Sequence, residues 1–186
     1  MLYVYVMRLI KLSAADYKKC SDFANSVDTS FYANRKQFNE EKRIKDSIIG
    51  KIGEIATYKA LKDKFPDLSL PDYAIYNKNQ KSWSHDLIAS NLNLHVKSQD
   101  VEQGKKYGES WVFQKEDKHI FKEYGQNDYV SFVSVDLKTR ECFVRQILPV
   151  SLLHEQNLFK PMKLLHLASK VAIYYDDIKD IKGHLV

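Results

Sequence analysis

The chain has 186 residues, of which 44% are hydrophobic, 28% are charged and 12% are aromatic, and its formal net charge is +5 at pH 7. These values are ordinary for one folded domain with a sizeable core, and the modest positive charge permits polyanion binding without establishing it. Cys20 and Cys142 are the only cysteines. Without CxxC spacing they argue against a zinc finger or a disulfide framework, and they indicate a reducing compartment.

The amino-terminal segment predicts a strand over residues 2–11, which are rich in Val, Tyr and Ile. Its apolar part, residues 2–10, is interrupted by Arg8 and is much shorter than the ~20 residues that span a bilayer. No small-residue cleavage site follows it. We therefore expect a cytoplasmic protein that does not contact membranes.

Two helices are predicted next. Ser13 and Asp16 have the spacing of a capping box, which predicts a helix over residues 14–26. A longer helix is predicted over residues 36–64, where isoleucines recur at helical spacing: Ile44, Ile48, Ile52 and Ile55. The apolar stripe should pack on a sheet.

Two glycines, Gly50 and Gly53, lie inside the longer predicted helix. Each costs about 1 kcal/mol relative to alanine in a helix interior, which suggests that the helix approaches another backbone closely. Glu54 lies one turn beyond Gly50 and shares its face. The helix is therefore expected to extend Glu54 over the edge of the sheet, with Lys51 at i−3 as an available charge partner.

The next segment predicts a strand at residues 73–76 and then a hairpin. The hairpin strands cover residues 83–88 and 92–98 and turn at Ser90 and Asn91.

The second hairpin strand has one polar and one apolar face. Side chains alternate along a strand, so His95 and Lys97 point to one face while Leu94 and Val96 point to the other. A paired imidazole and ammonium opposite an apolar face is unusual for a purely structural strand. An aspartate on the neighbouring strand, Asp86, could complete a polar cluster there.

The carboxy-terminal half predicts a helix over residues 110–124, then strands over residues 129–135 and 141–147. A mostly helical tail follows, with a late strand near residues 171–175. Helix, three strands, helix and two strands is the order of an α/β core with a mixed sheet.

In chain order, Glu54, Asp86 and the run His95-Val96-Lys97 resemble the PD-(D/E)XK nuclease superfamily, which includes many restriction endonucleases and repair nucleases. In that pattern a helix glutamate precedes an aspartate on a hairpin strand, and an acidic residue, any residue and a lysine follow on the next strand. Here His95 stands where the family usually has Asp or Glu. The resemblance implies one domain over residues 1–186, with a core at about 44–150 and a restriction-endonuclease-like mixed central sheet flanked by helices.

The resemblance also implies a divalent cation, Mg²⁺ or Mn²⁺, because phosphodiester hydrolysis needs an activated water and neutralised charge at phosphorus. Asp86 is the natural direct ligand, and Glu54 could bind directly or through water. The family commonly adds the backbone carbonyl at the position of Val96. Lys97 would support the attacking water.

Three roles are open for His95. As a neutral imidazole it could bind the metal, which would favour Mn²⁺ over Mg²⁺. It could act as general base, because its ordinary pKa lies close to neutrality. It could also hydrogen-bond the phosphate when protonated.

Three further residues are candidates. Asp72 follows Pro71 and could supply the aspartate instead of Asp86, although hairpin partners bring their side chains within ~5 Å and so favour Asp86. Gln99 shares the face of His95 and Lys97, and Gln114 lies early in the predicted helix over residues 110–124. Both glutamines could position phosphate or water.

Two basic groups are candidates for contact with double-stranded DNA, through phosphate contacts that weaken with salt. One combines Arg35 and Lys36 with Lys42, Arg43 and Lys45 of the long predicted helix. The other is the Lys105-Lys106-Tyr107 loop, within a run over residues 100–109 that two glycines should make flexible.

These observations predict a divalent-metal-dependent DNA endonuclease of the size of a type II restriction enzyme or a phage-borne nuclease. The resemblance alone implies a homodimer that cuts both strands. The alternative is an inactive nuclease fold, in which His95 has abolished hydrolysis and a DNA-binding or partner-binding subunit remains. A metal-dependent hydrolase acting on RNA is a third hypothesis.

Overall fold

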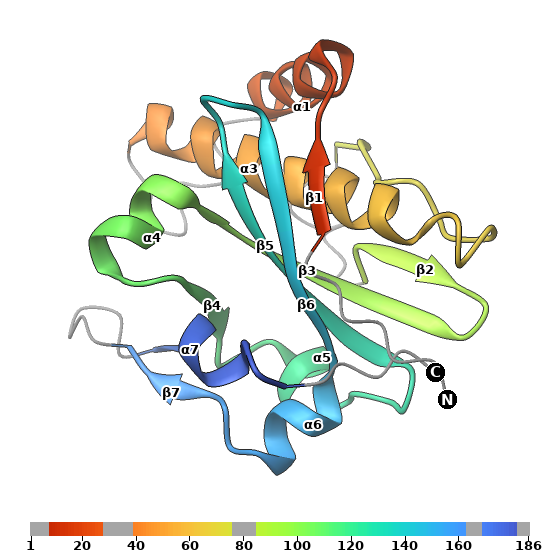
Figure 1. Cartoon of the computed structure of the whole chain (residues 1–186), viewed down its shortest axis with the longest axis vertical. Coiled ribbons are helices and arrows are strands. Elements are labelled where there is room, and N and C mark those ends of the chain that lie inside the picture. Colours follow the sequence, from red (N-terminus) through yellow and green to blue (C-terminus); the bar gives the residue numbers. More distant parts are fainter. Residues whose placement is uncertain (1–7, 28–38, 76–84, 163–168, 182–186) are drawn as a thin grey trace.

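The computed structural model describes residues 8–27, 39–75, 85–162 and 169–181 (Figure 1). Its centre is a five-stranded mixed sheet with the strand order β1-β6-β5-β3-β2. The strands are β1 (Arg8–Lys11), β2 (Leu87–Ala89), β3 (Leu92–Asp100), β5 (Asp128–Asp136) and β6 (Glu141–Pro149). Only the β3–β5 pair is parallel among these strands. The fold is therefore mixed α/β.

Two helices cover one face of this sheet, α1 (Ala14–Ser26) and α3 (Glu40–Leu61). The other face is covered by a three-stranded antiparallel sheet, ordered β4-β8-β7, and by short helices (Figure 1). The elements of this second layer and its surroundings are β4 (Ser110–Gln114), β7 (Lys160–Pro161), β8 (Lys170–Tyr174), α4 (Val101–Tyr107), α5 (Lys118–Phe121), α6 (Val150–Glu155) and α7 (Tyr175–Ile178).

The central sheet is buried on both faces, so two hydrophobic cores lie on either side of it. Strand β5 shows this directly, because Val133 packs with α1 and α3 while Val130 and Phe132 pack with Trp111 and the second sheet. A strand covered on both faces reads as a continuous apolar run rather than as an alternating one. On β3, Leu92, Leu94 and Val96 face α3 together with the polar Ser98, and His95, Lys97 and Gln99 lie on the opposite face.

Several predicted elements are confirmed. Helix α1 has the predicted bounds, and Ser13 and Asp16 form a full capping box. The predicted hairpin is the antiparallel pair β2–β3, and β5 and β6 form the later antiparallel pair. The long helix begins at Glu40, where Asn39 is its N-cap. Residues 36–38 lie outside the described part of the chain.

The predicted helix over residues 110–124 is wrong. Its first part is strand β4, and only Lys118–Phe121 is helical, as α5. Trp111 and Phe113 are buried while Val112 between them is exposed, which is the two-residue period of a strand. Residues 73–75 lie in no strand, and residues 101–107 form helix α4 rather than a flexible loop.

No helix in the described parts of the chain is long and apolar enough to cross a membrane.

Candidate functional site

Asp86 lies where strand β2 meets the edge of β3. Asp86 directly precedes Leu87, the first residue of β2. Its backbone N–H donates to the carbonyl of Leu94 at 2.8 Å. Its side-chain Oδ2 accepts a 2.7 Å hydrogen bond from the backbone N–H of Val96. The carboxylate thus takes the place of the next backbone acceptor in the ladder. This holds it beside the peptide groups of β3, as the hairpin pattern predicts.

Helix α3 approaches β3 closely at Gly53. A Cβ atom added there would lie 1.8 Å from Ser98 Oγ and 3.3 Å from Val96 Cγ1. The expected close approach is therefore confirmed at this glycine. At Gly50 no atom of the described residues lies within 4 Å of an added Cβ, so packing does not explain that glycine.

Glu54 follows Gly53 directly and is 7% exposed. Lys51, one turn earlier, donates to both of its carboxylate oxygens, at 2.9 and 2.8 Å. The Lys51 ammonium also lies 5.0 Å from the ring centroid of Phe23 and 5.7 Å from that of Tyr73. The charge partner at i−3 is thus Lys51, and two aromatic rings hold it in place.

The carboxylate of Glu54 is buried, that of Asp86 is partly buried, and the two repel each other. Burial and then the charge of Asp86 raise the pKa of Glu54 to about 8, although Lys51 opposes both effects. Burial also raises the pKa of Asp86, against the Val96 N–H and the charges of Lys97 and Lys51. A cation between them would relieve the repulsion and offset the burial that raises the pKa of both groups.

Asp72, the competing aspartate, hydrogen-bonds locally. Its Oδ1 accepts from the backbone N–H of Ala74 at 2.8 Å. Its charge is the weakest of the five influences that set the pKa of Glu54. It lies outside the contact between β2 and β3 that positions Asp86.

Lys97 lies on the face of β3 that is turned away from α3. Its Nζ is 3.8 Å from Asp117 Oδ2 and 5.1 Å from the ring centroid of Phe113. Asp117 is buried, and its Oδ1 has no hydrogen-bond partner among the described residues. Sequence reasoning missed Asp117, because residues 110–124 were interpreted as one helix. An acidic residue at the start of a helical turn was the available signal.

His95 lies in a group of three imidazoles. It is 4% exposed, and its ring centroid lies 4.5 Å from that of His85 and 6.5 Å from that of His119. Burial, together with the charges of His85, Lys97 and His119, lowers the pKa of His95 to about 3. His95 is therefore neutral at pH 7. Sequence reasoning missed His85, which directly precedes Asp86, and His119.

The two candidate glutamines hold the structure around the site. Gln99 Oε1 accepts from the backbone N–H of Ser110 at 2.7 Å, and its Nε2 donates to the carbonyl of Gly108 at 3.3 Å. Gln99 therefore links β3 to the start of β4. Gln114 lies at the end of β4 and not in a helix, opposite Lys170 of β8.

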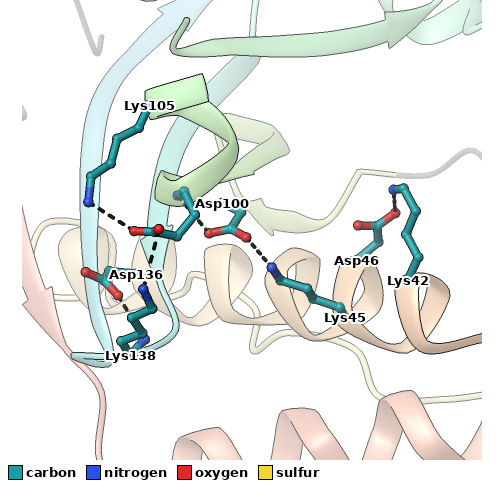
Figure 2. Close-up of polar contacts among 8 residues, drawn as sticks. Lys42, Lys45, Asp46, Asp100, Lys105, Asp136 and Lys138 are labelled. Atoms are coloured by element: carbon teal, nitrogen blue, oxygen red, sulfur yellow. Dashed lines mark hydrogen bonds and ion pairs between the residues drawn. The ribbon is translucent and has the colours of Figure 1, made fainter. Parts of the chain in front are cut away.

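The cations of α3 that were expected to contact DNA are paired with acidic groups (Figure 2). Lys42 Nζ lies 2.6 Å from Asp46, and Lys45 Nζ lies 2.5 Å from the buried Asp100. Arg43 is 4% exposed and donates to the carbonyl of Val27. These contacts leave the helix less positive than its sequence indicates.

The second basic group lies on α4. Lys105 is 3.0 Å from Glu102, which Lys138 also approaches at 3.4 Å (Figure 2). Lys106 lies over the ring of Tyr107, at 4.9 Å. The remaining two candidates, Arg35 and Lys36, lie outside the described residues.

The arrangement combines one buried and one partly buried carboxylate, a backbone edge and two ammonium groups. In residues 8–27, 39–75, 85–162 and 169–181 no group of three or more His, Cys, Asp or Glu side chains is placed to hold a metal ion. Comparison with known proteins gives no match, whether to a family model, to a curated protein or to a solved structure.

Proposed function

We propose that this protein is a divalent-metal-dependent DNA endonuclease with a PD-(D/E)XK-like site on a restriction-endonuclease-like fold. One observation carries the proposal. Glu54 of α3 and Asp86, which directly precedes β2, are far apart in sequence, yet both lie near Val96: Gly53 of α3 packs against its side chain and Asp86 accepts from its N–H. Burial and then the charge of Asp86 raise the pKa of Glu54. Strongly perturbed groups with a specific charge partner are typical of functional sites.

A divalent cation fits this donor set. Mg²⁺ and Mn²⁺ prefer oxygen ligands, and two carboxylates that disfavour their own ionisation gain most from a cation. Asp86 and Glu54 would hold it, together with the carbonyl of Val96. When bound, the cation would supply charge neutralisation at the phosphate and a more acidic water.

The other residues would prepare the site for that cation. Lys97 would orient the attacking water and neutralise charge on the phosphate. Lys51 keeps the Glu54 carboxylate in a fixed orientation through two hydrogen bonds. His95 is neutral, and a pKa of about 3 makes it a weak base, so the role of ligand suits it better than that of base or of cationic phosphate donor.

Double-stranded DNA as substrate and a homodimer as the active form are proposed from the family resemblance. The net charge of +5 is compatible with a polyanionic substrate.

Cleavage of supercoiled plasmid tests the proposal. Wild type should nick or linearise the plasmid in Mg²⁺ or Mn²⁺ and not in EDTA. Asp86→Asn, whose amide oxygen can still accept from Val96 N–H, should lower the rate by about 100-fold or more. Asp46→Asn, which changes an exposed carboxylate on α3, is the matched control and should retain the wild-type rate.

The second candidate is an inactive binding subunit, and one observation favours it: a neutral, buried imidazole occupies the position of an acidic ligand. A folded wild type that binds DNA equally in Mg²⁺ and EDTA and cuts neither DNA nor RNA would contradict the endonuclease. Cleavage of RNA alone would replace the proposed substrate.

A further inference from the structure

Three imidazoles from separate segments meet on the face of β3 that is turned away from α3. His85 precedes β2, His95 lies on β3 and His119 lies in α5. The ring centroids of His85 and His119 are 5.7 Å apart, and the other two separations are 4.5 and 6.5 Å. Folding thus brings together three nitrogen donors, of which only His95 has a role in the proposed carboxylate site.

These separations suit three ligands of one ion. Imidazoles bound to a tetrahedral ion through ~2.0–2.1 Å bonds place their ring centroids about 5 Å apart. As the side chains stand, no three ligands among the described residues converge on such an ion. His119 takes part in both of the longer separations and is partly exposed, so rotation of its side chain can shorten them.

Two of the ring nitrogens are buried without a hydrogen bond. Nε2 of His85 and Nε2 of His95 have no hydrogen-bond partner in the part of the chain that is described. Burying a polar nitrogen without a partner costs folding free energy. His95 is more than nine-tenths buried, so its Nε2 is a buried polar atom that has no hydrogen bond to any described residue.

A carboxylate is positioned beside them. Asp128 Oδ1 lies 3.1 Å from His85 Nε2, but the geometry is not that of a hydrogen bond. Two ligand atoms on one tetrahedral ion with such bonds are about 3.3 Å apart. Asn93 Nδ2 donates to the same oxygen at 2.8 Å and Gly125 N–H donates to the other at 2.6 Å, so Asp128 is held as ligand-orienting groups are.

We propose that His85, His95 and His119, with Asp128, bind a first-row transition-metal ion of the Zn²⁺ or Co²⁺ type. Neutral imidazoles and one carboxylate suit these ions, whereas Mg²⁺ requires oxygen ligands. The site uses neither the Glu54 nor the Asp86 carboxylate. It shares His95 with the proposed endonuclease, so the two proposals are alternatives for that side chain, and metal binding at this site does not depend on cleavage.

Co²⁺ binding to the untagged full-length protein tests this site without any assay of cleavage. Titration should produce the visible absorption of tetrahedral Co²⁺ with a 1:1 stoichiometry, and Zn²⁺ should abolish it. His119→Gln should weaken Co²⁺ binding by more than the ~10–100-fold that changes of second-shell partners cost. His95→Gln should do the same. Circular dichroism of each variant confirms that it is folded.

Two variants serve as controls. His154→Gln removes a histidine whose Nε2 bonds the carbonyl of Ile120, and glutamine can replace that bond, so Co²⁺ affinity should be unchanged. Asp86→Asn should also retain the affinity. A wild type without the tetrahedral spectrum, or one whose spectrum survives His119→Gln and His95→Gln, would overturn the proposal, as would loss of the spectrum in Asp86→Asn.

Discussion

The two halves of helix α3 carry the same kinds of charge under opposite conditions. Near its start, Lys42 and Asp46 form an ion pair with side chains 68% and 49% exposed (Figure 2). Further along, the side chains of Lys51 and Glu54 are 15% and 10% exposed, and a second carboxylate, Asp86, lies near them. Exposed ion pairs contribute ~0–1 kcal/mol to the free energy of unfolding, whereas burying a charge beside a like charge opposes folding. The buried half therefore has the character of a functional site, and the exposed half that of a solvated surface.

The largest expected effect comes from removing the buried cation. Lys51→Met should lower the free energy of unfolding by about 3–5 kcal/mol at pH 9, because the buried Glu54 carboxylate loses its ammonium partner and Asp86 loses a nearby positive charge. Lys42→Met, the matched exposed change, should alter it by less than about 0.5 kcal/mol. Urea unfolding at pH 9 measures both. Equal effects of the two substitutions would show that burial does not separate the two halves.

The second prediction concerns pH. The pKa of Glu54 is about 8 in the folded protein and 4.5 in its ordinary state, so unfolding releases a proton between these values. Stability from this group is fully present below pH 4.5 and is lost as pH rises through 8. Relative to Glu54→Gln, the wild-type protein should lose roughly 3 kcal/mol of its free energy of unfolding between pH 5 and pH 8.

Urea unfolding of wild type and Glu54→Gln at each pH gives the difference in their free energies of unfolding. This difference removes the contribution of other groups. His95 acts in the opposite direction, because its pKa is lowered and its stabilisation is lost as pH falls below 6.5. A difference that stays constant from pH 5 to pH 8 would contradict the raised pKa of Glu54.

The smallest effect tests the packing that buries Glu54. Gly53→Ala should destabilise by about 1–2 kcal/mol, because the added methyl group meets Ser98 and Val96 and overpacking outweighs the gain in helix propensity. Gly50→Ala meets no described atom within 4 Å and should stabilise by about 0.5–1 kcal/mol. Thermal unfolding of the pair measures both signs. Stabilisation by both substitutions would mean that α3 is not held tightly against β3.

The features that the sequence predicts correctly depend on neighbours in the chain. The capping box of Ser13 and Asp16, the β2–β3 hairpin and the pair of Lys51 with Glu54 all follow from short spacings. Helix α3 and β3 also carried enough pattern to predict the close approach at Gly53.

The features that the sequence does not predict depend on contacts between segments that are far apart in the chain. Strand β4 pairs with β8 across more than fifty residues of chain, and this partner overrides the helical interpretation of residues 110–124. Asp117 and His119 reach the β3 face only because β4 is a strand. The pairing of Lys45 with Asp100 likewise joins distant segments, so the expected basic surface could not be corrected from composition.

The hydrogen bond from Val96 N–H to Asp86 also blocks part of a sheet edge. Strand β2 covers β3 only as far as Leu94, so beyond this point the edge of β3 could pair with a strand of another chain. A carboxyl group that occupies such an edge discourages aggregation by strand addition. Asp86 therefore protects a sheet edge whether or not it binds a metal. This second task is a reason to prefer asparagine, which keeps the acceptor, over alanine at this position.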